Sequence, residues 1–359
     1  MLFAPKPAER ASQAQKHFAG TAHREAICVP NLLDFGPEIG QSHVHPNMTK
    51  AVSETLANLG ERGLIARMRG AMPSRGDVLV GAGDDCALVA WTEREDLVLK
   101  SDPVREGHHF LPDTDPRLVG RKALARVLSD FASMGAEPRW ALADLVAPAD
   151  APVARVEGVF EGFATLAREH AVALVGGDTS CGDALELHVF CAGAVPHGRA
   201  LLRSGAKPGD LLFSTGPLGD SFATGRHLTF EPRLAAGRRL REAGAHACID
   251  VSDGLASELW HLARESGMHL HVDLSAIPVS PTLAGRPDAI AHALGDGEDF
   301  ELLFAAPAPV EAEPGALPYP PAFGRVVGPA PGGAVTFSAG ADDPPRPLPE
   351  RGFDHFSVS

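Results

Sequence analysis

The sequence lacks the patterns that mark exported and membrane proteins. No Cys-X-X-Cys pair occurs among its five cysteines, and an odd number cannot form a complete set of disulfides. No uncharged apolar run approaches the roughly 18 residues that a transmembrane helix needs. The N-terminal MLFAPKPAER has no apolar segment typical of a secretory signal. We therefore expect a reduced, cytoplasmic protein without a membrane anchor.

Positive charge is scarce as well. The chain has 32 Lys and Arg against 46 Asp and Glu, which gives a net charge of -14. No basic run overrides this field, so we expect no nucleic-acid partner and no binding to anionic membranes. The excess carboxylates either keep the protein soluble or hold divalent cations, and the composition leaves both interpretations open.

Several common catalytic motifs are absent. The sequence has no G-X-X-X-X-G-K-[ST] phosphate loop, no G-X-G-X-X-G turn after a strand, no H-E-X-X-H pair and no G-X-S-X-G elbow. An ATP-using enzyme with this sequence must hold phosphate through metal ions and helix N-termini. The turns STGPLGDS and VSDGL offer such termini, although both also suit ordinary strand-to-helix connections.

Apolar strand patterns alternate with helical ones, which is typical of an α/β or α+β protein. The predicted helices are 116–134, 153–169, 232–243 and 254–266. The predicted strands are 78–80, 97–99, 172–175, 185–192, 211–214, 248–251 and 270–274.

The domain organisation is predicted from breaks in this pattern. Residues 193–208 are rich in Gly and Pro, and residues 1–47 show no sustained period, so we expect order to begin near Met48. The predicted organisation is an N-terminal extension over 1–48, a first domain over 49–195 and a second domain over 196–359.

The helix predicted over 116–134 has the clearest signals. Asp115 suits its N-cap and Pro116 its first position. At 100° per residue, Lys122, Arg126 and Asp130 lie together along the border of its apolar stripe. We therefore expect Asp130 to be neither part of the core nor freely solvated.

Aspartates follow the predicted strands repeatedly. Ligands bind at the carboxyl ends of strands in α/β proteins, and carboxylates gathered there repel one another unless cations intervene. Mg²⁺ prefers such oxygen ligands. The alternative is that GDD and GGD are simple turns and that Asp253 caps the helix 254–266. The aspartates concerned are Asp84, Asp85, Asp102, Asp178, Asp250 and Asp253.

Read together, nine segments of the chain resemble the thiamine-monophosphate kinase family. They occur in the family's order: GAGDDCALV, EGHHFLPDTDP, GRKALARVLSDFASMGAEP, LVGGDTS, GRALLRSGAKPGD, STGPLGDS, CIDVSDGLASEL, GDGEDFEL and GFDHF. This family belongs to the superfamily of aminoimidazole ribonucleotide synthetase and selenophosphate synthetase. The resemblance implies an α/β (α+β) fold of two halves whose N-terminal domains pair into a homodimer.

The resemblance also implies a reaction. The γ-phosphoryl group of ATP would be transferred directly, with several Mg²⁺ ions, onto thiamine monophosphate to give thiamine diphosphate. The acceptor phosphate has its second pKa near 6 and is mostly a dianion at neutral pH, so it needs no general base.

Site residues follow from the same resemblance, position by position. The implied magnesium ligands are Asp85, Ser101, Asp102, Asp130, Asp178, Asp250 and Asp253, with Asp130 and Asp253 also counted as catalytic. Gly177, Arg203 and Ser252 would contact ATP. His109, Glu298 and Phe353 would contact the thiamine end.

The chain departs from the family pattern at several positions. Lys100 stands where a hydroxyl residue is usual, Pro103 replaces a Thr, Cys181 replaces an Arg, and the stretch 221–232 is short. Because neighbours in a strand alternate faces, Lys100 is expected on the same side as Asp102. The number of metal ions is therefore left open. So are two alternatives, another ATP-dependent enzyme of the superfamily and an inactive nucleotide-binding paralogue.

Overall fold

The computed structural model describes residues 55–307, 321–340 and 343–350. The expected N-terminal extension and Phe353 lie outside these ranges. No helix in the described ranges is long and apolar enough to span a membrane.

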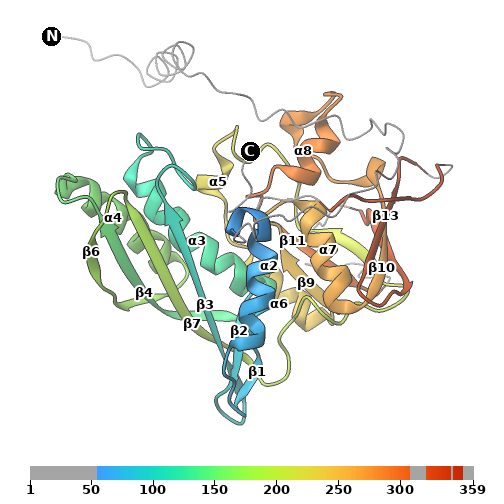
Figure 1. Cartoon of the computed structure of the whole chain (residues 1–359), viewed down its shortest axis with the longest axis horizontal. Helices are drawn as coiled ribbons and strands as arrows, with labels where there is room; N and C mark the ends of the chain where they lie inside the picture. The colour runs from blue at the N-terminus through green and yellow to red at the C-terminus, as the bar shows by residue number, and fades with distance from the viewer. Residues whose placement is uncertain (1–54, 308–320, 341–342, 351–359) are drawn as a thin grey trace, which may run out of the picture. The chain divides into compact units, whose positions relative to one another are not determined.

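The first half of the described chain forms a seven-stranded sheet (Figure 1). Its strand order is β1-β2-β3-β7-β4-β5, with β6 also pairing with β4. The pairs are antiparallel except those that β4 makes with β5 and β6. The strands are β1 (Val78–Val80), β2 (Ala87–Ala90), β3 (Glu95–Arg105), β4 (Glu137–Ala147), β5 (Ala173–Gly176), β6 (Thr179–Cys181) and β7 (Glu186–Pro196).

Two helices, α3 (Pro116–Ser133) and α4 (Val153–Glu169), pack on each other, and α3 also packs on β3 and β7. The N-cap predicted for α3 is present, since the Asp115 side chain accepts a hydrogen bond from the Arg117 amide at 2.9 Å. Gly120 lets α3 approach α4 closely, because a Cβ there would lie 1.8 Å from the carbonyl oxygen of Val159. The helix α2 (Leu56–Ala71) precedes this sheet and is kinked at Gly60, whose φ of 70° and ψ of 166° are not helical.

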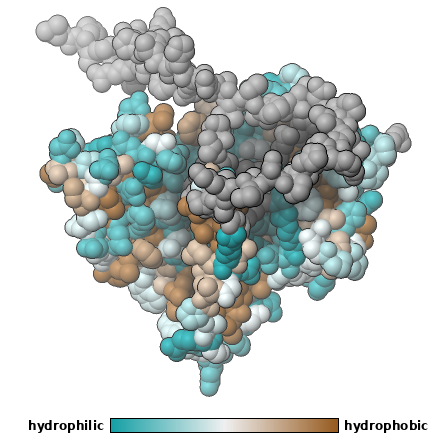
Figure 2. Space-filling model, viewed as in Figure 1, coloured by the Kyte–Doolittle hydropathy of each residue, from teal (hydrophilic) through white to brown (hydrophobic). Residues whose placement is uncertain are grey.

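The opposite face of the sheet leaves large apolar side chains exposed. Leu142 pairs with Phe190, and Trp140 pairs with Ala192, which also pairs with Leu99 on β3. The four large side chains of this group are 38–43% exposed. In Figure 2, apolar side chains also gather low on the molecule, where β1 and β2 lie. We call Leu99, Trp140, Leu142 and Phe190 the open apolar face.

The second half forms another seven-stranded sheet, of order β14-β13-β10-β12-β8-β11-β9. The helix α7 packs against β9, β10 and β13. The strands are β8 (Leu211–Ser214), β9 (Ala247–Asp250), β10 (Met268–Asp273), β11 (Leu302–Ala306), β12 (Gly324–Pro329), β13 (Ala334–Ser338) and β14 (Arg346–Pro347). The helices are α5 (Arg226–Thr229), α6 (Leu234–Ala243), α7 (Leu255–Ser266) and α8 (Ala289–Gly295), with short 3₁₀ turns at Leu274–Ala276 and Pro281–Leu283.

The helix α3 joins the two halves, because its second side contacts α5, α6 and β9. Gly237 of α6 permits this contact, since a Cβ there would lie 1.8 Å from the carbonyl oxygen of Ala132. As a result α3 is covered on both sides. Lys122 is fully buried and Asp130 is only 6% exposed. The expectation that Asp130 lies at the border of the core was therefore wrong.

The mixed class expected from the sequence is confirmed, and its α+β form describes the mostly antiparallel pairing. The sequence pattern missed β2, β4, β6 and β11 to β14, and it placed β3 over 97–99 only. Asp253 was considered as the cap of α7, but the residue at that position is Gly254. The two sheets fall in different halves of the chain, and the predicted domain boundary near 195 stays a prediction.

Candidate active site

Three carboxylates from distant parts of the sequence meet between the two halves. Asp85 lies before β2, Asp130 lies on α3, and Asp250 is the last residue of β9. One oxygen of each lies within 4.8 Å of the others, and all three residues are buried. We call them the carboxylate triad. They meet because α3 contacts the β9 end of the second sheet.

The triad fits a divalent cation. Asp85 is 2% exposed, yet its Oδ2 has no hydrogen-bond partner. A buried polar atom without a partner is rare in native proteins and indicates a missing ion or water. Carboxylate oxygens are also the ligands that Mg²⁺ prefers. The three residues present therefore suit the magnesium ion that the sequence predicts.

The acidities of these groups point in the same direction. Burial, followed by the charge of Asp85, raises the pKa of Asp250 to about 7 and that of Asp84 to about 6. Burial also raises the pKa of Asp130 well above its ordinary value. If all these carboxylates were ionised, their negative charge would exceed the positive charge around them. A bound cation would therefore favour their ionised forms.

Two side chains supply part of that positive charge. The Lys100 Nζ donates to Asp130 Oδ1 at 2.7 Å, and burial lowers but Asp130 raises the pKa of Lys100, with a net rise. Arg203 donates from Nε and Nη2 to Asp85 Oδ1 at 2.8 and 2.6 Å, and its backbone amide faces Asp84. Exposure alternates along β3, which confirms that Lys100 and Asp102 share the inner side of the strand.

A second cluster of buried and half-buried charged residues lies along the same helix. Arg126 donates from Nε and Nη2 to the two oxygens of Asp102 at 2.9 and 3.2 Å, and from Nη1 to Glu298 at 3.1 Å. Lys122 Nζ donates to the Glu298 carboxylate at 2.8 Å and to the carbonyl oxygen of His109 at 2.6 Å. We call Asp102, Lys122, Arg126 and Glu298 the Arg126 clamp.

The pKa shifts in the clamp differ from those in the triad, because cations are more numerous in the clamp. Burial opposes ionisation of Asp102, but Arg126 and then Lys100 lower its pKa overall. Burial lowers the pKa of Lys122 to about 8, although Glu298 partly offsets this effect.

The loop that carries Glu298 has an unusual backbone. Glu298 and Phe300 have φ values of +52° and +51°, a region that non-glycine residues rarely adopt. The Glu298 amide donates to the carbonyl oxygen of Ser252 at 2.6 Å. This places Ser252 beside the loop, while the Asp253 amide donates to Glu258 Oε1 at 2.9 Å. Strain of this kind is concentrated at functional sites.

Other predicted site residues lie away from the triad. Ser101 is exposed, on the opposite side of β3 from Asp102. Gly177 fits tightly against β4, since a Cβ there would lie 2.0 Å from the Ala143 carbonyl oxygen. Asp102 of β3 pairs with Val189 of β7, which pairs in turn with Ala143 of β4. Asp178 comes just after the next strand, β5. It therefore lies about three strand spacings, or roughly 14 Å, from Asp102. Asp178 is exposed as well.

Sequence reasoning assigned no role to several buried residues of this region. Ser129 Oγ donates to Asp250 Oδ2 at 2.6 Å. The alignment of Lys122, Arg126 and Asp130 on one side of α3 was visible in the sequence. The sequence did not show that the second half of the protein covers this side of α3 and so buries it. The residues concerned are Lys122, Arg126, Ser129 and Glu258.

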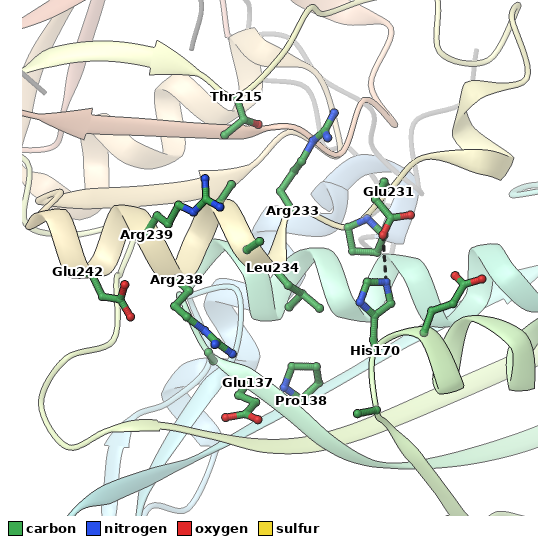
Figure 3. Close-up of a pocket in the computed structure, with 16 residues that line it drawn as sticks. Glu137, Pro138, His170, Thr215, Glu231, Arg233, Leu234, Arg238, Arg239 and Glu242 are labelled. Carbon is green, nitrogen blue, oxygen red and sulfur yellow. Dashed lines mark ion pairs between the residues drawn. The ribbon is translucent and has the colours of Figure 1, made fainter. Parts of the chain in front are cut away.

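A separate hollow of about 870 Å³ lies beside α6 (Figure 3). Its lining includes Arg233, Arg238 and Arg239 but also Glu137 and Glu242, so it favours no sign of ligand charge. None of the predicted site residues lines it.

Comparison with known proteins agrees with this architecture. Residues 83–195 match the family described as AIR synthase related protein, N-terminal domain. The thiamine-monophosphate kinase of Escherichia coli is 40% identical over 272 residues, which cover 69% of this chain and 83% of that relative. The chain therefore belongs to the thiamine-monophosphate kinase family, and the resemblance seen in its sequence is confirmed.

Solved structures support the same assignment. A structure described as AaThiL complexed with AMPPCP and TMP has a TM-score of 0.74 and 30% identity, and the match covers 85% of this chain and all of that one. The thiamine-monophosphate kinase of Stenotrophomonas maltophilia has a TM-score of 0.62 and 37% identity, covering 77% of this chain and 96% of its own.

Proposed function

We propose that this protein transfers the γ-phosphoryl group of ATP to the phosphate of thiamine monophosphate, giving thiamine diphosphate. The observation that carries the proposal is the carboxylate triad with its unpartnered Asp85 oxygen, in a chain of this family. The AaThiL structure was solved with AMPPCP and TMP, which are the ligand classes that this reaction needs. A cytoplasmic location forms part of the proposal.

The proposed reaction does not need a general base. The acceptor phosphate is already mostly dianionic at neutral pH, so the obstacle is the repulsion between two polyanions. Bound Mg²⁺ would neutralise this charge and align donor and acceptor. The protein's own contribution is to fix the buried carboxylates in place, with Arg203 and Ser129 bonded to their oxygens.

Roles for the individual residues remain proposals. Asp85, Asp130 and Asp250 would hold metal, with Asp102, Asp253, Ser101 and Asp178 as further ligands. Arg203, Ser252 and Gly177 would bind ATP, and His109 and Glu298 would bind thiamine monophosphate. Support comes from the burial of His109 and from the fixed position of Glu298 in the clamp.

We further propose that the protein acts as a homodimer through the open apolar face. This face exposes Leu99, Trp140, Leu142 and Phe190 side by side on three neighbouring strands. A contiguous exposed apolar patch of this kind is typical of an interface. Asp178 and Gly177 lie along the edge of the same sheet. In a dimer formed through this face, Asp178 of one copy would reach the metal cluster of the other.

The decisive experiment is a coupled assay of ADP release. We expect turnover of thiamine monophosphate that requires both ATP and Mg²⁺, with free thiamine a poor acceptor, because the site provides carboxylates for metal but no base for a hydroxyl. Comparable turnover of free thiamine would contradict the proposed acceptor.

One observation favours a second candidate, an inactive protein that binds nucleotide or thiamine phosphate. The Lys100 ammonium contacts Asp130 at 2.7 Å, where a ligand for metal is expected. The same assay separates the two functions, since binding of both ligands without ADP release identifies the inactive protein.

A further inference from the structure

Two cationic side chains donate hydrogen bonds to carboxylates at the proposed metal site. Lys100 reaches Asp130 from β3, and Arg126 reaches Asp102 from α3. Both cations are largely buried, with side chains 24% and 13% exposed. They are therefore fixed parts of the site and not surface charges that exchange freely with water.

Arg126 is held from two directions. It engages both oxygens of Asp102 and also Glu298, which Lys122 binds in turn. A guanidinium bonded to both oxygens of a carboxylate is a strong and geometrically defined pair, and it does not lose its proton. Asp102 thus has a permanent counter-ion whose position the rest of the clamp maintains.

Lys100 leaves Asp130 only partly satisfied. Its ammonium contacts one oxygen, Oδ1, at 2.7 Å. An ammonium is a compact, strongly hydrated point charge, so it can supply positive charge to a carboxylate where a metal ion would otherwise do so. The Asp85 Oδ2, by contrast, has no hydrogen-bond partner among the described residues.

We propose that Lys100 and Arg126 are built-in counter-ions that take the place of divalent ions at Asp130 Oδ1 and Asp102. Before nucleotide binds, metal binding in this chain is then confined to one ion held by the carboxylate triad. This inference rests on the proposed function, because it deepens the account of the metal site used for phosphoryl transfer.

The test counts metal ions and needs no turnover. Purified full-length protein is titrated with Mn²⁺ without nucleotide, and free Mn²⁺ is measured by electron paramagnetic resonance. We expect one ion per chain for the unmodified protein. Lys100→Met, which keeps the side chain's length but removes its charge, should bind two. Lys100→Arg, which keeps the charge, should still bind one.

A matched control removes the same charge elsewhere. Lys207 is exposed, so Lys207→Met should leave the count at one. If Lys100→Met tightens binding at a single site without adding an ion, Lys100 only repels the metal and the proposal is wrong. A count of two or more in the unmodified protein also overturns it.

Arg126 gives an independent measurement. Arg126→Gln should free Asp102 and add one ion, provided that circular dichroism shows an unchanged fold, whereas Arg126→Lys should add none. If both Lys100→Met and Arg126→Gln are folded and neither gains an ion, the inference fails. Turnover of thiamine monophosphate is assayed separately, so failure of the proposed function is recognised by absent turnover whatever the metal count.

Discussion

The carboxylate triad and the Arg126 clamp lie along the same helix but differ in their charge balance. In the clamp, the carboxylates of Asp102 and Glu298 face the cations of Lys122 and Arg126. In the triad, the cations of the described residues that pair with the three carboxylates and the neighbouring Asp84 are Lys100 and Arg203. The triad is buried and the clamp is buried or half-buried, so the larger difference between the clusters lies in their charge.

This difference indicates that the clamp stabilises the protein without a bound ligand, whereas the triad needs a cation. Buried charges that are fully paired hold the two halves of the protein in register, because removing one partner leaves the other unpaired. Buried carboxylates in excess destabilise the folded chain until a cation arrives. The comparison therefore gives the clamp a role in inter-sheet contact, in addition to the ligand roles proposed for Asp102 and Glu298, and it favours the triad as the first metal site.

Breaking the clamp should have the largest effect on stability. Lys122→Met removes a fully buried ammonium and leaves Glu298 with Arg126 alone. We expect the free energy of unfolding to fall by about 1.5–3 kcal/mol, the usual contribution of hydrogen bonds to a charged group, since Arg126 still pairs with Glu298. Urea denaturation measures this. Lys207→Met, at an exposed position, should change it by less than about 0.5 kcal/mol. A similar small change at Lys122 would show that the clamp has no structural role.

Breaking the triad should affect catalysis instead. Asp130→Asn keeps the shape of the side chain but removes the charge that would hold metal, so we expect kcat to fall at least about 100-fold. The fold should survive, because burial already disfavours the ionised form of Asp130. Steady-state kinetics and circular dichroism test both parts. The exposed Asp150→Asn should leave kcat unchanged, and activity within a few-fold for Asp130→Asn would exclude it as a metal ligand.

The triad should also show a pH-dependent response to metal, which the clamp should not. The folded-state pKa of Asp250 is raised from 3.8 to about 7, so without metal its contribution to stability is lost as pH rises from about 4 to 7. Mg²⁺ competes with that proton and should raise the melting temperature more at pH 8 than at pH 6. Thermal unfolding at matched ionic strength measures this. An equal Mg²⁺ effect at both values would contradict the assignment.

The sequence predicted one of these clusters better than the other. The helix α3, its cap Asp115 and the aspartates after strands were visible locally, so Asp85 and Asp250 could be singled out from the pattern. Asp130 was named as a ligand only through the family resemblance. The gathering of these ligands was expected at the carboxyl ends of strands, but one of them lies on α3, and the contact of α3 with the second half brings them together.

The clamp could not be predicted because it depends on long-range packing. Lys122 looks like a border residue on a helical wheel, and only the second half of the chain buries it. The Glu298 partner lies in a loop with positive φ values, a conformation that local propensity disfavours. The strand β11, of sequence LLFAA, also carries no alternation that distinguishes a fully buried strand from a helix.

The smallest and most specific effect should come from Ser129, the residue before Asp130 on α3. Its hydroxyl donates to Asp250 Oδ2 at 2.6 Å and so lowers the pKa of that carboxyl, against the larger effect of burial. A hydrogen bond to a charged group contributes about 1.5–3 kcal/mol, and one pKa unit corresponds to about 1.4 kcal/mol. Ser129→Ala should therefore raise the pKa of Asp250 by about one unit or more. The pH at which Mg²⁺ begins to raise the melting temperature should rise with it.

Ser133→Ala is the matched control for this change. Ser133 is equally buried on the same helix, but its hydroxyl donates to the backbone carbonyl oxygen of Asp130 and not to a carboxylate. Its loss should lower stability at every pH without moving the pH midpoint of the Mg²⁺ effect. If Ser129→Ala and Ser133→Ala behave alike, the hydroxyl of Ser129 only packs in the interior. A shift confined to Ser129→Ala would instead show that a single hydrogen bond from α3 sets the balance between proton and metal at Asp250.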